Sequence, residues 1–260
     1  MTHFFGFPWL PVEASEQAAT VDNMILYVHC LMLLLFVGWS IYFIYVLWRF
    51  RGKKQTKADY TGPKGIFSKY VEVGVILAEI VLLFGFSIPI WAELTANFPP
   101  PKDAVEVGIV AEQFAWNFHY PGPDGKFGKR DPKLVDVQTN ILGLDRTNDE
   151  AAKDDFTTNV LHLPVDQAVI AHVTSKDVIH SLGIPAMRVK QDAVPGMTIP
   201  VTFKPILEGK YLIACSQLCG NGHAHMRGFI EVQSKEAFDS WRQEQTNQAQ
   251  NASSQAGGEW

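Results

Sequence analysis

The chain has 260 residues, 27 acidic and 22 basic side chains, and a net charge of −5 with histidine neutral. This acidic balance, without a P-loop or dinucleotide fingerprint, points away from nucleic-acid and nucleotide binding. Long uncharged stretches in the first hundred residues are also unlike those of a cytosolic protein.

Two stretches are apolar enough to cross a bilayer as helices. Residues 24–48 carry no formal charge, and residues 73–92 carry only Glu79. A pair of buried core helices is the alternative, but the first stretch is apolar all round and has no polar stripe at helical period. We therefore predict a transmembrane helical hairpin over residues 24–98, preceded by a tail of residues 1–23.

The segment that joins the two spans is strongly basic, whereas the N-terminal tail is acidic. Seven basic residues face only Asp59 in this loop: Arg49, Arg51, Lys53, Lys54, Lys57, Lys64 and Lys69. The positive-inside bias therefore predicts a cytoplasmic loop, with both termini on the outer, periplasmic side of a bacterial inner membrane. The first residues lack a basic n-region, so we expect no cleavable signal peptide.

Two glutamates lie in or beside the second span. A charge inside a span is a functional hypothesis by default, because its burial in lipid is costly. For Glu79 two interpretations have equal weight. The residue can take part in a proton path, or it can be a protonated carboxylate at a helix contact. Glu72 lies at the membrane edge, where solvation at the interface is the simpler interpretation.

From Pro99 onward the sequence alternates as short strands do, which predicts an exported all-β domain over residues 99–245. The expected strands are residues 105–110, 114–120, 168–175, 199–205, 210–214 and 228–233. They predict a cupredoxin-like sandwich or barrel, in which two loops at one end meet around a metal. Residues 121–159 suggest an elaborated loop, residues 235–245 a short closing helix, and residues 246–260 a disordered tail.

The strongest motif is C-x3-C-x3-H-x2-M, formed by Cys215, Cys219, His223 and Met226, with His180 upstream. Thiolate, thioether and imidazole donors suit copper in electron transfer far better than magnesium or calcium. A mononuclear blue-copper site needs one cysteine only, so the second thiolate favours two bridged metals. Met226 then supplies a weak axial donor on one side, and a backbone carbonyl near Gln217 can supply the other.

Each of these residues also has a simpler interpretation. Cys215 and Cys219 can form a short-loop disulfide in an oxidising compartment, but the His and Met offsets favour metal. His225 breaks the spacing, so we interpret it as a loop histidine. No C-x-x-C-H motif for covalent haem is present in the sequence.

Beyond the Cys motif, DVIHS (177–181) and KQDAVPG (190–196) complete a pattern over residues 20–245. This pattern resembles subunit II of cytochrome c oxidase, of the haem-copper oxidase superfamily. The resemblance implies a dinuclear CuA centre of two copper ions held by His180, Cys215, the Gln217 carbonyl, Cys219, His223 and Met226. It also implies electron transfer from cytochrome c, or a similar donor, to haem in subunit I, where haem and CuB reduce oxygen to water. Other oxidase subunits, membrane lipid and proton translocation belong to the same expectation.

Five positions need separate comment. Many relatives carry Glu at Gln217, where the side chain helps to hold magnesium; an amide is a poorer ligand for a hard cation, which weakens the expectation of magnesium. The family often reads Q-W-x-W where this chain has Phe114 and Trp116, so both are candidates for the point where electrons enter, with a core aromatic as the alternative for each. Glu72 resembles a glutamate near the mouth of a proton channel, and the resemblance places Asp192 near subunit I.

Other classes of protein fit less well. A quinol oxidase subunit would lack the cysteines, and nitrous oxide reductase needs a second, histidine-rich copper cluster that eight histidines do not supply. A membrane-tethered copper carrier or assembly protein is the remaining alternative. It would bind metal without passing electrons onward. The exported domain carries 20 acidic and 15 basic residues, which suits a basic partner but also ordinary solubility.

Overall fold

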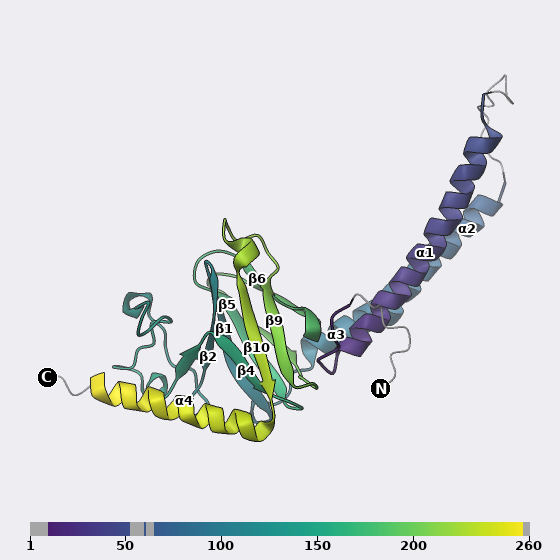
Figure 1. Ribbon diagram of the computed structural model, residues 1–260. Coiled ribbons are helices and arrows are strands. Elements are labelled where there is room, and N and C mark those ends of the chain that lie inside the picture. Colours follow the sequence, from purple (N-terminus) through teal and green to yellow (C-terminus); the bar gives the residue numbers. More distant parts are fainter. Residues whose placement is uncertain (1–9, 53–59, 61–64, 257–260) are drawn as a thin grey trace. The chain divides into compact units, whose positions relative to one another are not determined.

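The structure, a computed structural model, describes residues 10–52, 60 and 65–256. Most of the basic loop, including Lys53, Lys54, Lys57 and Lys64, lies outside these residues. The chain divides into a helical unit, residues 20–96, and a β unit formed by residues 97 onward together with the described residues before position 20. Figure 1 labels helices and strands of both units.

The helical unit contains the two predicted spans. Helix α1 covers Ala18–Arg49, and the second long helix consists of α2 (Phe67–Leu82), a π-helical turn (Leu83–Ser87) and α3 (Ile88–Ala96). Both are long and apolar enough to cross a membrane, and the apolar window of neither is buried inside the protein. They meet where the Tyr27 and Phe86 rings pack edge to face, with centroids 5.7 Å apart. The Ser87 hydroxyl there donates to Met24 Sδ at 3.9 Å.

The π-helical turn stands directly before Pro89 and has a local cause. Proline lacks an N–H, and its ring clashes with the carbonyl four residues earlier in a regular α-helix, here that of Gly85. In the structure the Ile88 N–H bonds instead to the Leu83 carbonyl, five residues back. The wider turn therefore lets the second span continue past a proline.

The β unit is a sandwich of two five-stranded sheets (Figure 1). In spatial order, the first sheet consists of β3 (Phe156–Thr158), β2 (Ala115–Tyr120), β1 (Ala104–Glu112), β5 (Ala168–Ser175) and β8 (Ile199–Phe203). The second consists of β4 (Val160–Pro164), β10 (Arg227–Gln233), β9 (Gly209–Cys215), β6 (His180–Ile184) and β7 (Val189–Ala193). Five 3-10 turns accompany them: Pro101–Asp103, Pro132–Leu134, Glu150–Ala152, Pro185–Met187 and His223–His225. The predicted fold of a helical hairpin followed by an all-β domain is confirmed.

The core of the sandwich follows from alternation along the strands. On β1 the side chains of Val105, Val107 and Ile109 point inward, where they join Leu161 and Ile230 of the opposite sheet in one buried cluster. Successive side chains of a strand face opposite sides, so Glu106, Gly108 and Val110 lie on the outer face. A rigid two-layer frame thus carries the loops at its ends.

All six predicted strands are present, but β3, β4, β6 and β7 escaped the sequence analysis. The expectation that the metal ligands lie in two loops is wrong for His180, which is the first residue of β6. The five residues of β6 are all buried and therefore show no alternation of apolar and polar side chains. The metal-ligand candidate consequently stands on a strand in the middle of a sheet, which holds it more rigidly than a loop would.

The polar segment after β2 is tied down by one buried carboxylate. Asp155 accepts hydrogen bonds from His119 Nε2 at 2.6 Å, from Gly122 N–H at 3.0 Å and from Gly128 N–H at 2.7 Å. Both side chains of the His119–Asp155 pair are almost fully buried. The predicted loop is therefore fixed to the outer face of the first sheet, although it carries little regular structure.

The C-terminal segment differs from its prediction. Helix α4 extends from Lys235 to Ala256, so the expectation of a disordered tail from residue 246 is wrong over its described part. Small side chains one turn apart, Thr246 and Ala249, are only 3% and 8% exposed. Their size lets the helix lie close to the domain without a large apolar residue, and composition alone does not reveal this contact.

The N-terminal segment packs into the β unit before α1 begins. Ala14 N–H donates to the Ala186 carbonyl at 2.8 Å, and Ile206 N–H donates to the Ala14 carbonyl at 3.0 Å. The Ser15 hydroxyl donates to the Met187 carbonyl at 2.8 Å, and Ser15 is buried. The described residues before the first span are thus part of the folded β domain rather than a free tail.

Candidate metal centre

Two neighbouring strands of the second sheet position the metal-ligand candidates. Cys215 ends β9 and His180 begins β6, and these strands are paired with Leu182 opposite Cys215. The segment between β9 and β10, residues 216–226, is called the Cys segment below and carries Cys219, His223 and Met226. Its two ends are held by the sheet, because Cys215 N–H donates to the Met226 carbonyl at 3.2 Å.

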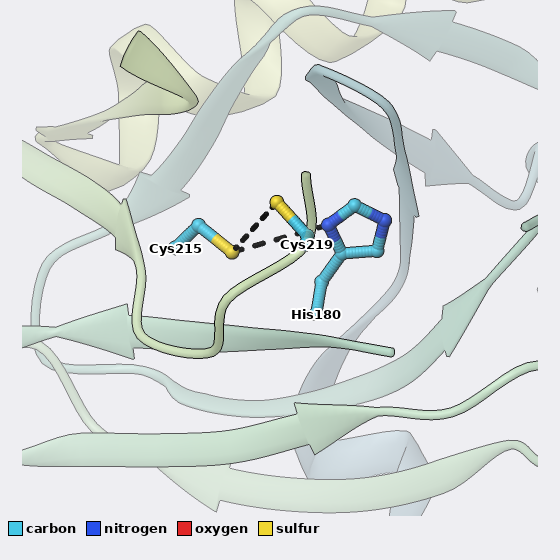
Figure 2. Close-up of side chains that lie close together, drawn as sticks. All are labelled: His180, Cys215 and Cys219. Carbon is cyan, nitrogen blue, oxygen red and sulfur yellow. Dashed lines mark hydrogen bonds between the residues drawn. The ribbon is translucent and has the colours of Figure 1, made fainter. Parts of the chain in front are cut away.

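The donor atoms of these residues converge at one place. The thiols of Cys215 and Cys219 lie 3.7 Å apart, Cys215 Sγ lies 3.9 Å from His180 Nδ1, and Cys219 Sγ lies 3.6 Å from His223 Nδ1. Met226 Sδ is 3.8 Å from Cys219 Sγ, and the Gln217 carbonyl oxygen accepts from the Cys215 thiol at 3.2 Å. Figure 2 shows His180, Cys215 and Cys219 pointing toward one another. All six positions predicted from the sequence therefore surround one point.

The two cysteines are free rather than joined as a disulfide. Their sulfur atoms are separated by far more than the roughly 2.05 Å of a sulfur-sulfur bond. Burial, with a further contribution from the Cys215 thiol, raises the pKa of Cys219 to about 11. A thiolate is costly here without a compensating cation, which a bound metal would supply.

The His180 imidazole is oriented by a carboxylate behind it. Nε2 lies 2.9 Å from Asp177 Oδ1, which leaves Nδ1 facing Cys215. Asp177 in turn accepts from the backbone N–H groups of Gln113 and Val178, each at 2.7 Å. Burial tends to raise the pKa of Asp177, but these hydrogen bonds, led by that of His180, outweigh it and lower the pKa.

Asp177 and Gln113 were not among the sequence-predicted site residues. Asp177 stands three residues before His180 in the DVIHS motif, and a carboxylate beside a metal-ligand histidine is a common arrangement that could have identified it. Gln113 belongs to the β1–β2 turn, more than a hundred residues before the Cys motif. No local spacing links that turn to the site.

The two candidates for the point where electrons enter lie in different environments. Trp116 is 2% exposed, and its ring packs edge to face with that of His180 at 6.4 Å between centroids. Phe114, at the tip of the β1–β2 hairpin, is 41% exposed. Trp116 is thus a core aromatic behind the site, whereas Phe114 reaches the surface beside it.

The other residues singled out in the sequence lie away from these donors. His225 is exposed on the 3-10 turn and is not among the converging donors. Glu72 and Glu79 are both exposed on α2 of the helical unit. Asp192 lies on β7 opposite Ser181, and the Ser181 hydroxyl, together with Lys190, lowers its pKa despite an opposing effect of burial.

The donor set fits copper and not a hard cation. Two sulfur thiols, two imidazoles and a thioether are soft or borderline ligands, which favour copper, whereas magnesium requires oxygen donors. The Gln217 side chain is exposed and carries an amide instead of a carboxylate. Among the described residues, the group of metal-binding side chains that stands close together is His180, Cys215 and Cys219.

Comparison with known proteins identifies related chains. The family described as cytochrome C oxidase subunit II, periplasmic domain, matches residues 105–233. The chain is 28% identical to the alternative cytochrome c oxidase subunit 2 of Bradyrhizobium diazoefficiens, over 94% of this chain and 86% of that protein. It is 31% identical to the heme-copper oxidase subunit 2 of Aeropyrum pernix, over 76% of this chain and 77% of that protein.

One solved structure is also similar. The periplasmic domain of subunit II of the cytochrome oxidase of Bradyrhizobium japonicum is 29% identical, with a TM-score of 0.43, over 58% of this chain and 99% of that one. The match to the Bradyrhizobium diazoefficiens protein covers so much of this chain that it includes the helical hairpin as well as the β domain. The chain therefore belongs to the cytochrome c oxidase subunit II family of haem-copper oxidases.

Proposed function

We propose that this subunit holds a dinuclear CuA centre of two copper ions and relays electrons from cytochrome c, or a similar donor, to haem in subunit I. His180, Cys215, the Gln217 carbonyl, Cys219, His223 and Met226 are the proposed ligands. When bound, the copper pair supplies reversible one-electron transfer. Oxygen reduction at the haem and CuB of subunit I, coupled to proton translocation, is the reaction that the oxidase complex completes.

The pairing of donors is the observation that carries this proposal. Each thiol lies close to the other and also faces its own imidazole: Cys215 faces His180 and Cys219 faces His223. A single copper needs one thiolate, whereas two shared thiolates can bridge two metals with one imidazole for each. The Gln217 carbonyl and Met226 then stand as weak donors on opposite sides.

The protein's contribution is to hold these donors still. His180 is fixed by Asp177 and by its place in β6, and the Cys segment is fixed by Ser216 N–H donating to the Ser181 carbonyl at 2.8 Å. A cradle that keeps one geometry in both oxidation states reduces the reorganisation that accompanies each electron transfer. No general acid, base or nucleophile is required of this subunit.

Phe114 is the better candidate for the surface through which electrons enter. It is exposed and packs against the Cys segment, whereas Trp116 is buried. The negative charge of the whole chain favours a basic electron donor through long-range attraction. Trp116, in contact with His180, serves in this proposal as packing behind the metal ligand.

As a member of this family, the chain is a membrane protein whose β domain lies on the outer side. We place its termini on the periplasmic side of a bacterial inner membrane. Support comes from the packing of residues 10–18 into the β unit, which puts the start of α1 and the exported domain on one side. Subunit I, further oxidase subunits and lipid are the proposed partners of the helical hairpin. Glu72 near the start of α2 stays a proton-path candidate, and the amide of Gln217 gives magnesium little support.

Metal analysis of the purified full chain in detergent tests the proposal. We expect two copper ions per chain and a mixed-valence electron paramagnetic resonance spectrum with one unpaired electron shared by both. One copper per chain with an ordinary Cu(II) signal would instead favour the copper carrier. A sulfur-sulfur bond between Cys215 and Cys219 in the copper-treated chain would exclude both functions.

A further inference from the structure

We infer that Gln113 is a positioning residue for the metal centre, because it joins the His180 side of the site to the Cys219 side. The inference rests on the copper function proposed above. It assigns a role to a residue outside the ligand set, at the tip of a hairpin in the other sheet. The β1–β2 pairing ends with Glu112 opposite Ala115, so Gln113 and Phe114 form the turn.

The side chain of Gln113 reaches the Cys segment. Its Nε2 donates to the Cys219 carbonyl at 2.6 Å. A carbonyl fixed in this way limits rotation of the Cys219 backbone. The position of the Cys219 thiol, which faces Cys215, His223 and Met226, is limited with it.

The backbone of the same residue reaches the other half of the site. Gln113 N–H donates to Asp177 Oδ2 at 2.7 Å, and Asp177 Oδ1 lies 2.9 Å from His180 Nε2. One residue therefore contacts the carboxylate that orients the first imidazole and the backbone that carries the second thiol. The His180 half and the Cys219 half of the site come from segments more than thirty residues apart in the sequence. Gln113, which belongs to the other sheet, contacts both and so connects them.

Phe114 adds a packing contact between the β1–β2 turn and the Cys segment. A Cβ placed on Gly222 would come within 2.5 Å of the Phe114 ring, and one placed on Gly220 would come within 2.8 Å of Gln113 Nε2. Gly220 also has φ +132°, a conformation that L side chains rarely adopt. Glycines in the Cys segment thus permit the hairpin turn to press directly against it.

Gln113 is exposed, so replacing it should leave the fold intact. Gln113→Met keeps the length and the backbone N–H but removes the amide donor, and Gln113→Glu places a carboxylate against the Cys219 carbonyl. Gln243→Met on the exposed side of α4 is the matched control. All are compared with the wild-type full chain in detergent, first without metal and then loaded with copper.

We expect Gln113→Met to lose copper to excess chelator about five- to tenfold faster than wild type, the effect of one hydrogen bond. Gln113→Glu should lose it faster still, and the spectrum of the copper pair should change in both variants. Gln243→Met should match wild type in rate and spectrum. Circular dichroism of the metal-free variants should also match wild type.

Three results decide the matter. Wild type without two coppers would remove the proposed function itself, and this inference with it. Wild type with two coppers and a Gln113→Met variant of unchanged rate and spectrum would overturn only the inference. Loss of the metal-free fold in Gln113→Met would also overturn it, because Gln113 would then act on the whole domain and not on the site.

Discussion

His180 Nε2 lies 2.9 Å from Asp177 Oδ1, so the ring is held with Nδ1 toward Cys215. Removal of this carboxylate in Asp177→Ala frees the imidazole to rotate. Because outer partners of metal-ligand histidines commonly contribute 10- to 100-fold to metal affinity, we expect copper affinity to fall by about that factor. Competition with a chelator measures it. Asp239→Ala on α4 is the control, and equal affinities of the two variants would contradict the orienting role.

Cys219→Ser should abolish the two-copper spectrum, because one bridging thiolate is lost. The comparison is Cys30→Ser, which removes the cysteine of α1 and should leave both coppers in place. Copper analysis and electron paramagnetic resonance give the answer. An intact mixed-valence spectrum in Cys219→Ser would contradict the bridging arrangement.

Met226→Leu should retain copper, change its reduction potential and slow turnover. The Met226 sulfur stands 3.8 Å from Cys219 Sγ, where a thioether is a weak axial donor that tunes a copper site more than it holds the metal. Redox titration of the loaded chain measures the potential, with the exposed thioether variant Met197→Leu as control. A potential and turnover both equal to wild type would remove Met226 from the site.

The ligand set could be predicted from sequence because its members lie in a short motif whose chemistry is specific. His180, far from that motif, was named with it as a second imidazole, but its place on β6 was missed because a fully buried strand does not alternate. Gln113 could not be found from spacing, since its contacts depend on how the two sheets stack. Asp177, three residues before His180, was overlooked although a carboxylate beside a metal-ligand histidine is common. The last turns of α4 were missed because the side chains that pack there are small. The low content of large apolar residues in this segment suggested that it would not pack.

Arg188 holds the N-terminal segment against the β unit, and we expect an unusual order of stabilities among its variants. Its guanidinium donates to the carbonyls of Pro11, Val12 and Pro185, while its backbone adopts the left-handed conformation with φ 55°. Arg188→Ala loses these hydrogen bonds and keeps a strained backbone. Arg188→Gly also loses them but relieves a backbone strain of about 1–2 kcal/mol. Thermal unfolding should therefore rank wild type above Gly and Gly above Ala. A glycine variant less stable than the alanine variant would contradict this account.

Asp155→Ala should be among the most destabilising single changes in the β unit. It leaves His119 Nε2 and the N–H groups of Gly122 and Gly128 without their acceptor in a site from which water is almost excluded. Breaking a buried pair on one side typically costs about 3–5 kcal/mol. Thermal unfolding of the full chain, followed by near-ultraviolet circular dichroism, measures the loss. Asp124→Ala, an exposed carboxylate of the same loop, should cost little, and comparable losses in the two variants would show that Asp155 does not hold the loop.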